Sequence, residues 1–146
     1  MRALVIGYGN GLRRDDGAGL QVAERLAVRV PSARVVTVHE LVPELAGDIA
    51  GASVVVFADA AADAGGGMTA SRIGDDGDPP PLSHVADPRT LLALAAALHG
   101  RRPEAWLVTV PAHDLGFGEG LSDATARAVE DAVAAVERIV TAPRPG

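Results

Sequence analysis

Three side chains in this sequence have the chemistry of metal ligands or of general acids and bases: Asp16, Asp59 and His84. Asp16 lies in a glycine-rich stretch at 7–19 (GYGNGLRRDDGAG), between an apolar segment and a helical pattern. Asp59 directly follows a run of apolar, largely β-branched residues, and His84 comes shortly before a predicted helix start. Two carboxylates and one imidazole can bind a borderline cation such as zinc or nickel and leave positions open for substrate or water.

The predicted secondary structure explains how the two aspartates could meet. Residues 2–7, 34–39 and 53–58 are typical of strands, with helical patterns at 17–30 and 43–49 between them. If the first strand lies between the second and the third, the loops after strands one and three face one crevice. Ligands of open α/β sheets bind in such a crevice, beyond the carboxyl ends of the strands.

The second half of the chain completes the predicted sheet. Too few residues separate a fourth strand from the third for a parallel crossover, so we expect it to be antiparallel and at or near an edge. The solvated loop after it is long enough, at most ~33 Å when extended, to return His84 to the crevice. The remaining predicted elements are the fourth strand at 68–73, a helix at 87–100, a strand at 104–110 and a helix from 122 to 140.

Length and composition fit one α/β domain. The 146 residues are 48% hydrophobic but only 3% aromatic, so the core must consist of Val, Leu, Ile and Ala, as in a mostly parallel sheet covered by helices. We predict a single-domain three-layer sandwich over 1–141, with a twisted five-stranded sheet and helices on both faces. Residues 142–146 are expected to form a flexible C-terminal tail.

Charge and composition disfavour several partners. The formal net charge of −6 disfavours nucleic acid and anionic membranes, and there is no cysteine for disulfides or thiolate sites. No stretch approaches the ~20 apolar residues of a membrane span. The apolar start of the chain is too short for a signal peptide, which favours a cytoplasmic protein. Gly7 and Gly9 begin a dinucleotide fingerprint, but Leu12 stands where the third glycine belongs, so we expect no nucleotide.

Each candidate ligand also has an ordinary structural explanation. Asp16 could cap the helix that follows it, Asp59 could be a turn residue, and His84 could lie on the surface. Of the other histidines, His99 suits the negative end of its helix, whereas His113 follows the last strand and could line the crevice. The glycines of the first turn are expected to let the backbone of a substrate approach closely.

The motifs together resemble those of the hydrogenase maturation proteases, endopeptidases that trim the C-terminus of nickel-iron hydrogenase large-subunit precursors. The resemblance covers nearly the whole chain, and its most specific part is the stretch at 7–19. The other matching segments are 57–60 (FADA), 83–84 with 91–92, and 108–111 with 118–122.

The resemblance implies that Asp16, Asp59 and His84 bind metal and carry the reaction. Members often have Glu at the position of Asp16, so the carboxylate here is one methylene shorter. The family acts on the large-subunit precursor after nickel insertion, so the substrate supplies the nickel, for which zinc or cadmium could substitute in vitro. The metal could polarise the scissile carbonyl or activate water, or a carboxylate could act as general base.

Two other functions remain open on the sequence alone. One is a non-hydrolytic nickel-sensing or chaperone-like binding protein on the same scaffold. The other is a nucleotide-binding α/β domain, which the two carboxylates of the first turn disfavour because they would face the phosphates.

Overall fold

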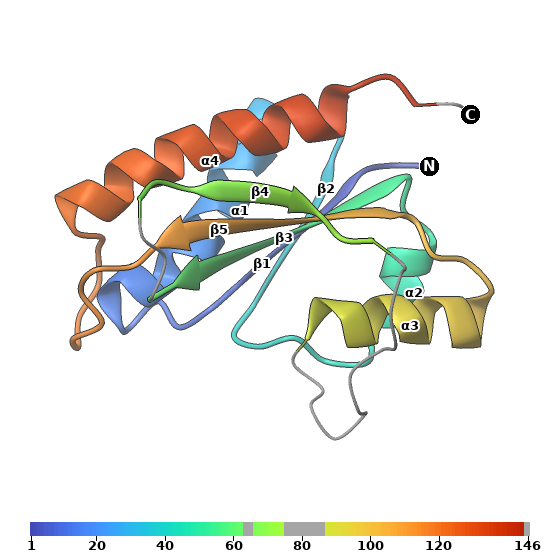
Figure 1. Ribbon diagram of the computed structural model, residues 1–146, viewed down its shortest axis with the longest axis horizontal. Coiled ribbons are helices and arrows are strands. Elements are labelled where there is room, and N and C mark those ends of the chain that lie inside the picture. Colours follow the sequence, from blue (N-terminus) through green and yellow to red (C-terminus); the bar gives the residue numbers. More distant parts are fainter. Residues whose placement is uncertain (63–65, 75–86, 145–146) are drawn as a thin grey trace.

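The computed structural model describes residues 1–62, 66–74 and 87–144. Its centre is a five-stranded sheet in the order β2-β1-β3-β5-β4, in which only β4 is antiparallel to its neighbour (Figure 1). The first strand therefore lies between the second and third, and the antiparallel strand lies at an edge, as predicted. The strands are β1 (Leu4–Tyr8), β2 (Arg34–Val38), β3 (Val54–Ala61), β4 (Thr69–Arg72) and β5 (Glu104–Pro111).

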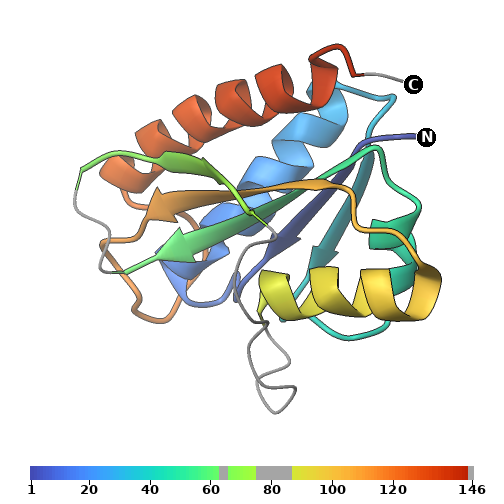
Figure 2. The same ribbon diagram turned by 45° about the vertical axis from the view of Figure 1, so that its right-hand side comes forward.

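Helices cover both faces of the sheet, which confirms the predicted three layers (Figure 2). One core lies under α1 (Ala18–Arg29) and α4 (Asp123–Thr141), and is built mainly of Val and Ala. The opposite core lies under α2 (Leu45–Ala50) and α3 (Pro88–His99), and contains Phe57 with several Leu and Ile residues. In the described part of the chain, no helix combines the length and apolar character needed to cross a membrane.

Local capping signals fix the ends of α3. The Asp87 side chain accepts a hydrogen bond from the Arg89 N–H at 2.7 Å, and Pro88 occupies the first helical position. Gly100 ends the helix with a left-handed φ of 72°, and His99 lies in the last turn, at the negative end of the helix. These features agree with the sequence prediction for both the helix and His99.

Gly9 and Gly19 have a different role from the one expected for the glycines of 7–19. A Cβ on Gly19 would lie 2.3 Å from the Ala58 carbonyl oxygen, so α1 packs directly on β3. Gly9 has a φ of +145°, and a Cβ there would lie 2.1 Å from the Asp16 carbonyl oxygen. The expectation that these glycines admit a substrate backbone is wrong at both positions, because the protein's own backbone fills the space.

Candidate functional site

The carboxyl ends of β1, β3 and β5 point to one edge of the sheet, where the turn after β1 and the loop after β5 lie side by side (Figures 1 and 2). Asp16 and Asp59 both lie at this edge, and both are half-buried. The segment 14–17, which carries Asp16, packs against the strand that carries Asp59, and the negative charge of Asp16 contributes to the raised pKa of Asp59. The structure therefore brings together two of the three predicted site residues.

Asp59 lies in a setting that favours its protonated form. Burial raises the pKa of its carboxyl from 3.8 to about 6, and repulsion from Asp16 adds to this effect. Hydrogen bonds from the Ala60 N–H, at 2.8 Å, and from the Tyr8 hydroxyl act in the opposite direction but are outweighed. Burial and the nearby charge of Asp59 in turn raise the pKa of Tyr8 well above its usual value. The Ala60 N–H thus holds one oxygen of a carboxylate that is costly to ionise.

Asp16 does not cap the helix that follows it. Its Oδ2 accepts a hydrogen bond from the Asn10 N–H at 2.9 Å, back towards β1. A short 3₁₀ helix (Arg14–Gly17) precedes α1, and the N-cap of α1 is Gly17, with no side-chain cap. The helix-capping alternative is therefore wrong. Among the described residues, no hydrogen bond engages the other carboxylate oxygen of Asp16, which leaves that oxygen available to a ligand.

His84, the third predicted ligand, lies outside the described residues, so its role stays a prediction. The nearby Asp87, at the start of α3, contributes to the raised pKa of Tyr8, so the start of this helix lies near the end of β1. Within 1–62, 66–74 and 87–144, no group of three or more His, Asp or Glu side chains is arranged to hold a metal ion.

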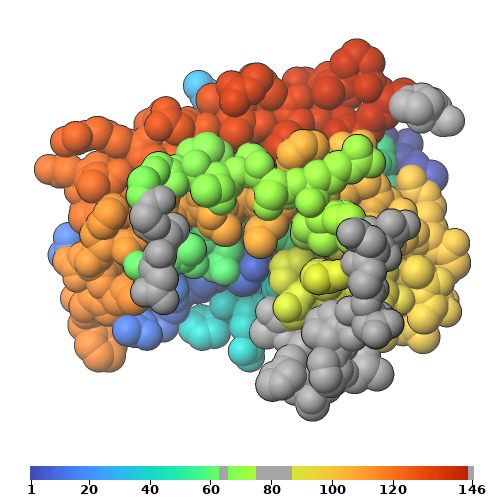
Figure 3. All heavy atoms as spheres, viewed as in Figure 1, coloured from blue at the N-terminus to red at the C-terminus, as the bar shows by residue number. Residues whose placement is uncertain are grey.

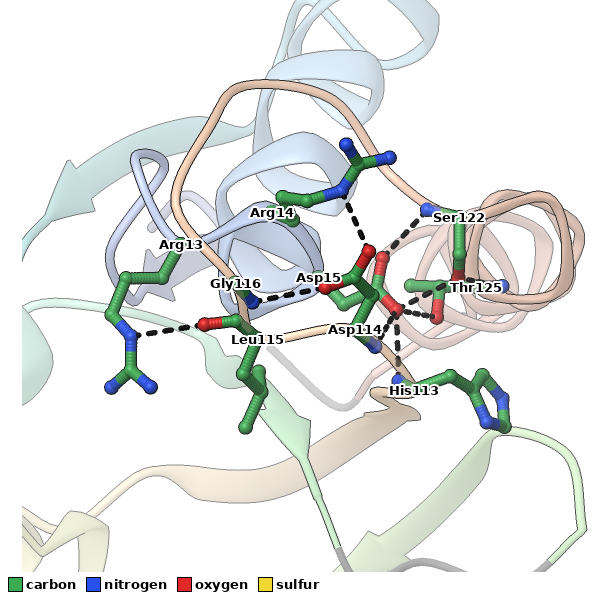
Figure 4. A network of polar contacts seen from close by, with 9 residues as sticks. All are labelled: Arg13, Arg14, Asp15, His113, Asp114, Leu115, Gly116, Ser122 and Thr125. Carbon is green, nitrogen blue, oxygen red and sulfur yellow. Dashed lines mark hydrogen bonds and ion pairs between the residues drawn. The ribbon is translucent and has the colours of Figure 1, made fainter.

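A large polar network at this edge centres on Asp15, for which the sequence predicts no role of its own. Asp15 is completely buried, and its carboxylate accepts five hydrogen bonds (Figure 4). Three come from the backbone N–H groups of His113, Asp114 and Ser122, at 2.7–2.8 Å. The other two come from the Ser122 hydroxyl, at 2.7 Å, and from the Thr125 hydroxyl, at 2.8 Å, which also lies 2.8 Å from the Pro111 carbonyl and shares its proton between the two acceptors. The network joins the first turn to the loop after β5 and to the start of α4.

The pKa of Asp15 shifts in the opposite direction to that of Asp59. Burial alone would raise the pKa of Asp15, but the N–H donors of Ser122, Asp114 and His113 and the Ser122 hydroxyl outweigh it. The net result is a pKa well below the ordinary value, so Asp15 is ionised throughout the physiological range. The His113 ring is exposed and directed away from the Asp15 carboxylate (Figure 4), so His113 serves this network through its backbone.

Backbone hydrogen bonds extend the connection between the two loops. The Asp15 N–H donates to the Asp114 carbonyl at 2.9 Å, and the Arg14 N–H donates to the Gly118 carbonyl at 3.0 Å. The Gly118 N–H donates to the Leu12 carbonyl at 2.9 Å. Arg14 also forms an ion pair with Asp114 at 3.0 Å. The turn after β1, which carries Asp16, is therefore fastened to the loop after β5 along most of its length.

Comparison with solved structures shows what this architecture is similar to. A [NiFe] hydrogenase maturation protease, HybD from Thermococcus kodakarensis, matches with a TM-score of 0.75 and 26% identity, over 97% of this chain and 100% of that chain. The hydrogenase maturating endopeptidase HybD from E. coli matches with a TM-score of 0.69 and 26% identity, over 93% and 90% of the two chains. Over nearly its full length, the chain is therefore similar in fold and in sequence to hydrogenase maturation proteases.

A third match agrees with this assignment. A hydrogenase 2 maturation peptidase from a Thaumarchaeota archaeon has a TM-score of 0.69 and 25% identity, over 97% of this chain and 99% of that chain. The sequence matches no protein-family model and no curated protein sequence. The likeness therefore rests on solved structures that match over nearly the full length of each chain. These matches show that the protein is a peptidase.

Proposed function

We propose that the protease removes the C-terminal extension of a nickel-iron hydrogenase large-subunit precursor, in the cytoplasm, after nickel has been inserted. The observation that carries this proposal is the pair of half-buried carboxylates, Asp16 and Asp59, at the carboxyl edge of the sheet. Their mutual repulsion contributes to the raised pKa of Asp59, and a cation between them would relieve it. The names of the similar structures support the same reaction class.

In this proposal the nickel belongs to the substrate. Asp16, Asp59 and His84 complete its coordination, because carboxylate oxygens and an imidazole nitrogen suit this ion. The two carboxylates are already oriented, since each has one oxygen held by a backbone N–H, from Asn10 and from Ala60. The coordination then places the peptide bond to be cleaved beside the carboxylates, which lowers the entropic part of the barrier.

The experiment that tests this function is an incubation of the purified protein with the large-subunit precursor, prepared with nickel and without it. Intact mass and electrophoresis would follow the length of the precursor. We expect shortening of the nickel-loaded precursor only. Binding without shortening in both preparations would contradict the proposal, and would favour a nickel-sensing binding protein on this fold.

A further inference from the structure

Two large apolar side chains are exposed on the two loops that meet at the candidate site. The Leu12 side chain lies on the turn after β1 and is 59% exposed, and Phe117 lies on the loop after β5 and is 94% exposed. A parallel bridge pairs Arg13 with Gly118, and in its register Leu12 lies opposite Phe117. Figure 3 shows the two segments side by side at the surface, the turn in blue and the loop in orange. The two residues define what we call the docking patch.

The backbone around the docking patch is held in a costly conformation. Arg14 has a φ of 46°, a left-handed value that residues other than glycine rarely adopt. Gly118 and Gly120 have φ of 135° and 92°, which glycine adopts without the clash of a side chain. The buried Asp15 carboxylate holds both loops in this arrangement through its five hydrogen bonds. This network fixes the backbone of a loop that presents the Phe117 side chain almost fully exposed. Fixed, exposed apolar groups are typical of binding surfaces.

The docking patch and the candidate site share the turn after β1. Leu12 and Asp16 lie on the same turn, and a hollow of about 560 Å³ beside Leu12 is lined by Gln21 and Glu119, among other residues. A folded protein that brings a peptide bond to Asp16 must therefore lie against this turn and the loop fastened to it. Two further large apolar side chains are strongly exposed, Val28 on α1 and Leu98 on α3, and both lie outside these two loops.

Charge next to the docking patch indicates the chemistry of its partner. Arg13 is exposed, and its Nε donates to the Leu115 carbonyl at 3.3 Å, while the rest of its guanidinium is directed away from the Asp15 network (Figure 4). Arg13 has no ion pair within the part of the chain that the structure describes. An apolar partner surface with a carboxylate at its rim would match the docking patch and this guanidinium.

We propose that Leu12 and Phe117 dock the folded body of the protein substrate beside the bond to be cleaved, in an apolar socket with an acidic rim. This inference rests on the proposed function, because it takes the hydrogenase large-subunit precursor as the partner. The docking patch supplies affinity for the folded precursor, and the carboxylates act on its chain end.

The test is the affinity of the full chain for purified nickel-loaded precursor, measured by biolayer interferometry on Phe117→Ser and Leu12→Ser. Each loop variant should raise Kd roughly tenfold to hundredfold, as expected when a large apolar contact is lost from a buried interface. Phe117→Leu should restore most of the affinity. Val28→Ser and Leu98→Ser are matched controls, since each removes an exposed apolar side chain elsewhere, and should leave Kd unchanged within twofold.

Any of four results would overturn the docking proposal. The first three are no binding by the unchanged protein, an unchanged Kd in both Phe117→Ser and Leu12→Ser, or an equal loss of affinity in the control variants. The fourth is a dimer of this chain that Phe117→Ser dissociates without a change in Kd for the precursor. Binding that depends on the docking patch, in a protein that does not shorten the precursor, would support the docking proposal and contradict the proposed function. The two proposals can therefore fail separately.

Discussion

Two adjacent aspartates, Asp15 and Asp16, occupy opposite surroundings. Asp15 is completely buried and accepts five hydrogen bonds from the described residues, whereas Asp16 is half-buried and accepts one from them, from the Asn10 N–H. The turn after β1 thus directs one carboxylate into the protein and presents the next at the carboxyl edge of the sheet. The inner carboxylate therefore stabilises the two loops, and the outer one is available for ligands.

Asp59 extends this comparison across the sheet. Folding lowers the pKa of Asp15 but raises that of Asp59 to about 6, so the first carboxylate stabilises the fold when ionised and the second destabilises it. A costly ionised group at an open edge is typical of functional sites. The following variants test this division, in order of decreasing expected effect.

Asp15→Asn should lower the free energy of unfolding at pH 7 by about 3 kcal/mol, because the amide removes the charge that five donors bind. Urea unfolding would measure the change. Asp114→Asn is the matched control on the neighbouring loop and should cost about 0.5 kcal/mol or less, because it removes only a partly exposed ion pair with Arg14. The amide oxygen can still accept the hydrogen bond that the Asp114 Oδ1 accepts from the Gly116 N–H. Equal effects of the two substitutions would contradict the scaffold role of Asp15.

The pH dependence of the Asp15 contribution has a definite sign. Folding lowers the pKa of Asp15, so its contribution is complete above the ordinary value of 3.8 and is lost as the pH falls from there towards the folded pKa. The stability difference between the unchanged protein and Asp15→Asn should therefore shrink below about pH 4. A difference that stays constant down to pH 2 would show that the charge of Asp15 is not what stabilises the loops.

Ser122→Ala should lower the free energy of unfolding by about 2 kcal/mol, because the hydroxyl serves two elements at once. It donates to Asp15 at 2.7 Å and accepts a hydrogen bond from the Thr125 N–H, which caps α4. Thermal and urea unfolding would both report the loss. In the Asp15→Asn background the same substitution should cost less, and strict additivity would show that the two residues do not form one network.

Asp59→Asn should stabilise the protein at pH 7.5, by about 1 kcal/mol once solvent screening is allowed for. Between pH 3.8 and about 6 the folded state keeps the Asp59 proton while the unfolded state loses it, so stability falls as the pH rises through this range. The neutral amide avoids that cost. Melting temperatures of both proteins at pH 4 and pH 7.5 would measure this difference. A lower melting temperature for the variant at pH 7.5 would contradict the claim that the ionised Asp59 destabilises the fold.

The fold could be predicted because its signals are local. The β-branched run that ends at Asp59 and the Asp87-Pro88 helix start each depend on a few neighbouring residues. The antiparallel edge position of β4 followed from the short connection before it. Asp16 and Asp59 could be placed at one edge because parallel strands end on the same side of a sheet.

The Asp15 network could not be predicted in the same way. Its donors lie between 98 and 110 residues away in the sequence, and three of them are backbone groups that carry no residue signature. Ser122 could be predicted only as the start of the last helix, and no pattern in the sequence singled out Thr125. Long-range packing decides which of two adjacent carboxylates turns inward, and the sequence pattern contains no measure of it.

The most direct test of the central claim compares precursor processing and stability in Asp16→Asn. The amide oxygen can still accept the Asn10 N–H, so urea unfolding should change by less than about 0.5 kcal/mol. Processing of the nickel-loaded precursor should fall at least a hundredfold, because the amide lacks the negative charge that coordinates nickel. Processing at the rate of the unchanged protein, with the fold intact, would contradict the assignment of Asp16 to the site.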